Sequence, residues 1–193
     1  MAVPWIGYFM LEQSLLRQLI KEAKSGDAAA FERIIIVHER MVLRLAQRLL
    51  LNREDAKDAA QEVFIRLHRN LSRFQEEKDF GPWLYRMTVN ICRDSLRRSP
   101  RGPSSDLILE IPDRALDPEQ SLLLAQRQKL VLSALENLSA REREVIVLRD
   151  LEGCSTSEVA QALGISEATV RSQISTARVK IKRFVMTRFR RPT

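Results

Sequence analysis

The sequence has few of the residues that build metal centres and disulfide frameworks. Its 193 residues include two cysteines, Cys92 and Cys154, and two histidines, His38 and His68. The cysteines lie far apart and form no CxxC pair, so we expect neither a disulfide framework nor a zinc cluster. Both histidines lie in stretches with helical character, and we expect neither to ligate a metal. The sequence thus predicts no metal and no cofactor, and a reducing cytoplasm is the natural compartment of such a chain.

Catalytic motifs and long apolar runs are missing too. We find no P-loop, no GxSxG and no HExxH, so the sequence predicts no catalytic residue and no enzyme. The apolar run MAVPWIGYFML at residues 1–11 is far shorter than a membrane span and lacks the basic start and cleavage site of a signal peptide. We interpret it as a short packing segment or a start-site extension, and we expect no membrane insertion.

Acidic residues are absent from the C-terminal end of a chain that is basic overall. The formal net charge is +7 and the isoelectric point is near 9.9, which indicates a polyanionic partner. This charge alone does not distinguish nucleic acid from a membrane surface. From Ala168 to Thr193, however, there are eight Lys or Arg residues and no Asp or Glu. That bias favours DNA over a merely solvated helix.

The segment 155–184 has the pattern of a helix-turn-helix. Ser155 and Glu158 are spaced as a capping box that begins a short helix. Gly164 suits the left-handed position that ends a helix. Ser166 then begins a second helix, which we expect to continue to about residue 184.

Two stripes run along this second helix. Its apolar stripe consists of Val170, Ile174, Ala177 and Ile181. Its polar and basic stripe consists of Arg171, Ser175, Arg178 and Lys182. A recognition helix in the DNA major groove needs one side docked on a scaffold and a basic side left outside. The alternative is an amphipathic helical hairpin with a solvated basic face, and we predict DNA binding.

The chain divides into two helical domains and a linker. Four of the seven prolines fall between Ser99 and Pro118, so we predict a flexible linker at 99–117 between domains at 1–98 and 118–193. Helical periodicity dominates and strand alternation is absent, so the predicted fold is all-α. We expect a four-helix domain and then a helix-turn-helix domain, with helices at about 11–24, 28–51, 53–71, 82–98, 118–138, 139–153, 155–164 and 166–184.

The third predicted helix carries a polar face. Asp58, Gln61 and Glu62 are three and four residues apart and therefore lie on one side of the helix. Val63 and Phe64 lie opposite them. Such a face suits docking to a basic helical partner, and the alternative is an ordinary solvated surface.

The fourth predicted helix carries side chains that read bases and bind phosphates. Arginine and asparagine share one side of this helix at Arg86, Asn90, Arg93 and Arg97. We expect Trp83 and Tyr85 to pack in the core. Phe74 and Phe80 bracket the polar loop at 72–79, and they either stack on unpaired bases or pack in the core.

These motifs together resemble a known family. The pattern D-x-x-Q-E-x-F, a loop, and F-x-x-W-L-Y-R-x-x-x-N-x-x-R-D resemble region 2 of the extracytoplasmic-function (group 4) sigma factors of bacterial RNA polymerase. The pattern L-x-x-L-x-x-R-E-R-E-V followed by the helix-turn-helix is similar to their region 4, and the Pro-rich segment is similar to their linker. The resemblance extends from about Leu15 to Phe184.

The resemblance implies a sigma factor that binds core RNA polymerase, recognises the minus-35 and minus-10 promoter elements and promotes DNA melting. The implied surface for the β′ clamp helices consists of Asp58, Gln61, Glu62 and Phe64. The expected minus-10 contacts, beside the loop, are Phe74, Phe80, Arg86, Asn90, Arg93 and Arg97. The expected minus-35 contacts are Arg171, Ser172, Ser175, Thr176 and Arg178. The implied partners are core polymerase, through its β′ clamp helices and β flap, promoter DNA and an anti-sigma factor.

The sequence departs from the family pattern at three places. Several relatives carry a bulky or basic residue where Ser175 and Thr176 stand, and Gly and Asp are common where residues 75–78 read Gln-Glu-Glu-Lys. The base preferences at both promoter elements therefore stay open. The apolar run at 1–11 matches nothing in the family pattern.

Two other classes of protein are weighed against a sigma factor. A helix-turn-helix activator or repressor would not need the basic helix of the first domain. A DNA recombinase would need a catalytic Ser, Tyr or carboxylate cluster near the start of the chain, and we find none.

Overall fold

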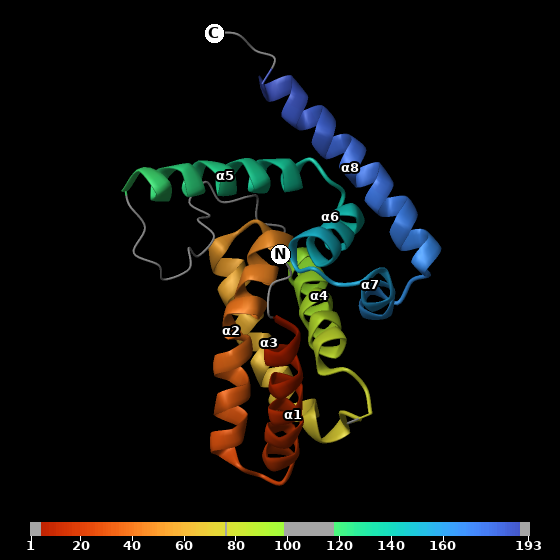
Figure 1. Cartoon of the computed structure of the whole chain (residues 1–193). Helices are drawn as coiled ribbons and strands as arrows, with labels where there is room; N and C mark the ends of the chain where they lie inside the picture. Colours follow the sequence, from red (N-terminus) through yellow and green to blue (C-terminus); the bar gives the residue numbers. More distant parts are fainter. Residues whose placement is uncertain (1–4, 76, 99–117, 190–193) are drawn as a thin grey trace.

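The computed structural model describes residues 5–75, 77–98 and 118–189, and this part of the chain contains helices and no strand (Figure 1). The first half consists of α1 (Trp5–Lys24), α2 (Ala28–Leu50), α3 (Arg53–Asn70), the 3-10 turn η1 (Leu71–Arg73) and α4 (Phe80–Arg98). The second half consists of α5 (Pro118–Glu136), α6 (Ala140–Ile146), the π-helical turn η2 (Val147–Leu151), α7 (Thr156–Leu163) and α8 (Glu167–Phe189). The predicted all-α fold is confirmed. The predicted linker lies outside the described residues.

Side-chain caps fix where several helices begin. The Asp27 carboxylate accepts hydrogen bonds from the first backbone N–H groups of α2 at 2.8 and 3.1 Å, and the Asn52 side chain does the same for α3. Complete capping boxes precede α6, with Ser139 and Glu142, and α7, with Ser155 and Glu158. These bonds satisfy N–H groups that have no partner inside the helix.

Several helix boundaries differ from the prediction, and four of them are informative. α1 begins at Trp5, before the expected residue 11, and α4 begins at Phe80 and includes Pro82 in its first turn, where proline removes no helical hydrogen bond. α8 continues to Phe189, because no glycine or proline interrupts it before Pro192. α6 ends at residue 146, where the chain enters the π turn.

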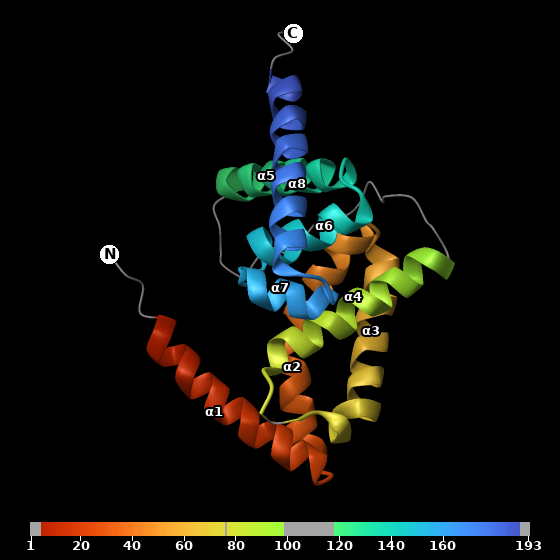
Figure 2. The same cartoon turned by 90° about the vertical axis from the view of Figure 1, so that its right-hand side faces the viewer.

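The two halves pack against each other. α4 lies against α7, and the C-terminal part of α2 contacts α6 and the π turn (Figures 1 and 2). Buried apolar residues of both halves belong to one continuous cluster. The C-cap residue of α2 is Leu51, whose φ of 56° is left-handed, and the nearby Leu49 carbonyl accepts a hydrogen bond from Arg143 at 2.9 Å. A second-half side chain therefore caps a first-half helix.

Candidate nucleic-acid interface

The predicted helix-turn-helix is present. α7 begins after the cap at Ser155 and ends at Gly164, whose φ of 67° is a left-handed conformation that glycine adopts without strain. Val170 and Ala177 of α8 are fully buried. The apolar stripe therefore docks α8 on the second half and leaves its polar stripe outside.

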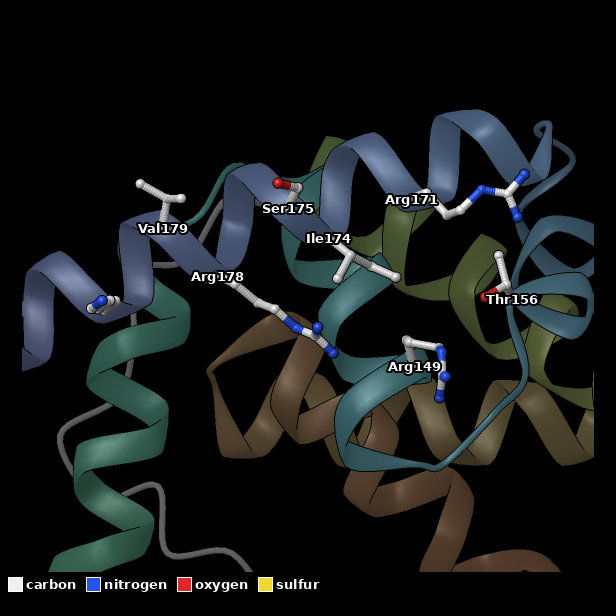
Figure 3. A pocket seen from close by; sticks show the side chains of 8 residues that line it. Arg149, Thr156, Arg171, Ile174, Ser175, Arg178 and Val179 are labelled. Atoms are coloured by element: carbon white, nitrogen blue, oxygen red, sulfur yellow. The ribbon is translucent and has the colours of Figure 1, made fainter.

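An open hollow of about 510 Å³ lies between α8 and the facing α7 and π turn (Figure 3). Its lining comes from α7, α8 and the π turn, and consists of Arg149, Thr156, Arg171, Ile174, Ser175, Arg178, Val179 and Lys182. Four of these side chains are cationic and none is acidic. Figure 3 shows Arg149 and Arg178 extending into the same space from facing elements. The hollow therefore suits an anionic ligand.

Two lining residues outside α8, Arg149 and Thr156, were not expected from the sequence. The amphipathic pattern describes one helix at a time, whereas these residues come from the π turn and from α7. A signal was nevertheless present, since the charged pair Arg149-Asp150 interrupts an apolar run at the end of α6.

Exposed ion pairs orient the arginines of this surface. The Arg178 guanidinium donates to both carboxylate oxygens of Asp150, at 3.0 and 2.7 Å, and this pairing raises the pKa of Arg178. Arg171 donates to Glu167 at 3.0 Å. Both arginine side chains are more than 60 % exposed, at 61 % and 63 %. Exposed pairs contribute little stability, so phosphate groups can replace these carboxylates at small cost.

The five predicted minus-35 residues do not all share this hollow. Arg171, Ser175 and Arg178 line it together. Ser172 and Thr176 are exposed on the neighbouring side of α8, where the Thr176 hydroxyl donates to the Ser172 carbonyl at 3.1 Å.

The basic face of α4 is partly covered by the second half. Arg86, Asn90 and Arg97 are exposed. Arg93 is half-buried and donates two hydrogen bonds to Glu144 of α6, at 2.7 and 2.6 Å. This contact raises the pKa of Arg93. One of the predicted DNA contacts is therefore engaged within the protein.

Phe74 and Phe80 require a correction. Each is only 5 % exposed, and their rings meet edge to face with centroids 5.5 Å apart. Trp83 lies 5.0 Å from Phe74, and His38 lies 5.2 Å from Phe80. Because this cluster encloses both rings, neither offers a face to an unpaired base in this structure. They hold the ends of the loop at 72–79 against the core.

The polar face of α3 is accessible as expected. Asp58 and Gln61 are exposed, and Glu62 is half-exposed. Phe64 packs partly against the core, so it is less available to a partner. Ile65 is 46 % exposed and follows Asp58 by two helical turns on the same side. The pattern of polar residues on this helix does not indicate the apolar centre.

Neither cysteine forms a disulfide. Cys92 and Cys154 are buried free thiols, and burial raises the pKa of Cys92 and raises that of Cys154 to about 11. The described ranges contain no cluster of three or more residues suited to a metal ion. Within those ranges, no helix is both long and apolar enough to cross a membrane.

Comparisons with known proteins match both halves. The family model described as Sigma-70 region 2 matches residues 34–102, and the one described as Sigma-70, region 4 matches residues 128–181. The chain is 31% identical over 183 residues to the ECF RNA polymerase sigma-E factor of Haemophilus influenzae, covering 90% of this chain and 96% of that protein.

Solved structures share the fold. CnrH, solved in complex with the cytosolic domain of CnrY, is 28% identical with a TM-score of 0.69 and covers 90% of this chain and 98% of its own. The sigma factor RpoE, solved with the anti-sigma factor NepR from Bartonella quintana, is 21% identical with a TM-score of 0.66 and covers 81% and 96%. The helix-turn-helix, the basic α4 and these matches lead to one family. The chain belongs to the extracytoplasmic-function sigma factors of the sigma-70 family, the subunits that direct bacterial RNA polymerase to promoters.

Proposed function

We propose that the hollow beside α8 is the surface through which this sigma factor reads the minus-35 element. The observation that carries this assignment is the set of four cationic side chains from α8 and the π turn around one open space, without an acidic residue among the lining. Arg171 can pair with a guanine edge in the major groove, and Arg149 and Lys182, which line the same hollow, can bind phosphates.

The minus-10 element and its melted strand are assigned to α4. Arg86, Asn90 and Arg97 are exposed on one side of this helix, and Arg93 joins them once its contact with Glu144 is broken. The guanidinium groups bind phosphates and the asparagine amide reads a base edge. Phe74 and Phe80 are left out of this assignment.

Core polymerase is assigned to α3, whose polar face meets the β′ clamp helices, while the second half meets the β flap. Asp58, Gln61 and Glu62 supply acceptors for basic partners, and Ile65 supplies an apolar centre. An apolar centre within a polar rim is the usual arrangement of a protein interface.

The remaining assignments follow from the same role. The chain has no enzymatic activity of its own, acts in the cytoplasm and is held inactive by an anti-sigma factor. The similarly folded RpoE bound to NepR supports such a partner. The proposed domains are 1–98 and 118–193, with the linker at 99–117.

Reconstituted transcription tests the function as a whole. The protein should confer promoter-dependent transcription on core polymerase, yet bind free promoter duplex poorly, because each half has only one short DNA-reading surface. Runoff transcription and duplex titration with and without core enzyme measure both effects. Nanomolar binding of a specific duplex by the chain alone, with no gain from core polymerase, would identify an activator or repressor instead.

Substitutions on α3 test the core-binding surface. Asp58→Ala with Glu62→Ala should weaken binding to core enzyme. The free energy of unfolding should change by no more than about 0.5 kcal/mol for the exposed Asp58 and no more than about 1 kcal/mol for the half-exposed Glu62, which loses its surface ion pair with Arg66. The matched control is Glu32→Ala with Glu39→Ala, which removes two exposed carboxylates from α2. Competition for labelled core polymerase gives the affinities. Equal affinities for the double variant and the wild type would show that another surface binds core enzyme.

A further inference from the structure

A bidentate ion pair joins the basic face of α4 to α6 in the second half. The Nε and Nη2 atoms of Arg93 donate to the two carboxylate oxygens of Glu144 at 2.7 and 2.6 Å. The Glu144 side chain is 7 % exposed and that of Arg93 is 21 % exposed. A carboxylate in this bidentate geometry accepts hydrogen bonds from the same two guanidinium N–H groups that a phosphate would use. Glu144 therefore occupies the position at which Arg93 would bind the DNA backbone.

A second carboxylate makes a similar contact beside it. Glu152, which follows the π turn, accepts from Arg44 at 3.0 Å and also pairs with Arg48, and both arginines belong to α2. Its side chain is only 2 % exposed. A carboxylate so deeply buried is tolerated only beside cationic partners, so the packed arrangement of the halves depends on the pairs that Glu152 makes with Arg44 and Arg48.

In the ion pairs across this contact, all the negative charges lie on one half and all the positive charges on the other. The second half supplies the carboxylates, Glu144 and Glu152, and the first half supplies the guanidinium groups, Arg44, Arg48 and Arg93. The two contacts involve different first-half helices, α4 and α2, so together they fix the orientation of one half on the other. DNA phosphates compete for the same kind of cation.

We propose that this contact is an autoinhibitory lock, in which Glu144 masks Arg93 until the two halves separate. The lock rests on the proposed minus-10 role of Arg93. In the closed chain Arg93 is neutralised and partly covered, so the minus-10 face is incomplete. Separation of the halves frees Arg93, which then completes a face whose other members, Arg86, Asn90 and Arg97, are already exposed.

The test uses the full-length chain with Glu144→Gln, which keeps the side-chain size and removes the charge. Spin labels on cysteines placed at the exposed positions Arg69 of α3 and Thr187 of α8 report the distance between the halves. Fluorescence anisotropy measures binding of single-stranded minus-10 DNA by the free chain. We expect the variant to have a larger fraction of molecules with a long distance between the two spin labels. We also expect its affinity for the single-stranded minus-10 DNA to rise roughly tenfold, which is within the usual range of coupling between two sites. The control, Glu32→Gln, makes the same chemical change at an exposed carboxylate of α2 and should change neither measurement.

A charge-swapped variant distinguishes loss of the ion pair from loss of the folded structure. Arg93→Glu with Glu144→Arg should restore the short distance, while circular dichroism verifies helix content in every variant. If the spin-label distances in Glu144→Gln equal those of the wild type, the ion pair does not hold the halves together and the lock is wrong. If the distances lengthen but the DNA affinity does not rise, Glu144 does not mask Arg93. Arg93→Ala in the holoenzyme separates this from the proposed function, because wild-type melting by that variant would show that the minus-10 assignment itself is wrong.

Discussion

Arg171→Ala is expected to weaken holoenzyme binding at the minus-35 element by roughly 1–3 kcal/mol and to relax base preference there. The Arg171 side chain lines the hollow, is 63 % exposed, and forms a surface ion pair with Glu167. Its loss therefore leaves the fold intact and removes one base contact. Competition between promoters with single changes in the minus-35 element measures the effect.

Arg97→Ala provides the contrast on the other DNA surface. Arg97 is 74 % exposed near the end of α4, where we expect it to contact a phosphate near the melted region. Its loss should lower the salt slope of binding by about one unit with unchanged upstream preference. Permanganate reactivity of unpaired thymines reports melting. Two results together would show that the roles of the two helices are reversed. They are loss of melting by the Arg171→Ala holoenzyme on a promoter that this holoenzyme still occupies, and a changed base preference at the minus-35 element in Arg97→Ala.

Leu148→Ala is expected to lower the free energy of unfolding by about 2–5 kcal/mol, the usual cost of a cavity at a buried leucine. Leu148 lies in the π turn and is fully buried, and its carbonyl accepts a hydrogen bond from the Cys154 backbone at 3.0 Å. Urea unfolding followed by circular dichroism gives the value. The control is Leu122→Ala on α5, which is 60 % exposed and should shift stability by no more than about 0.5 kcal/mol. Equal effects of the two substitutions would mean that the π turn is not part of the core.

Local signals predicted most of the helices, because capping is decided within a few residues. Asp27, Asn52 and the two capping boxes act on N–H groups no more than three residues away, so their sequence patterns are sufficient. The buried stripe of α8 was predictable for the same reason, since spacing along one helix decides which residues share a side.

What the sequence did not predict depends on contacts between distant segments. Arg93 and Glu144 are 51 residues apart, and no periodicity indicates that they meet. The burial of Phe74 and Phe80 likewise depends on His38 and Trp83, which close the aromatic cluster. Arg149 was missed because a regular helix through residues 147–151 would have directed its side chain elsewhere.

The shape of the hollow depends on the number of residues in the π turn. The Glu152 N–H donates to the Val147 carbonyl, five residues earlier, at 2.9 Å, so this turn holds one residue more than an α-helical turn between the same ends. Deleting a single residue there would let α6 continue as a regular helix and rotate the following side chains by about 100°. Asp150 would then lose its position beside Arg178, and Arg149 would leave the hollow. Related chains that differ by one residue at this point should therefore present a different minus-35 surface, even where every residue of their recognition helix is the same.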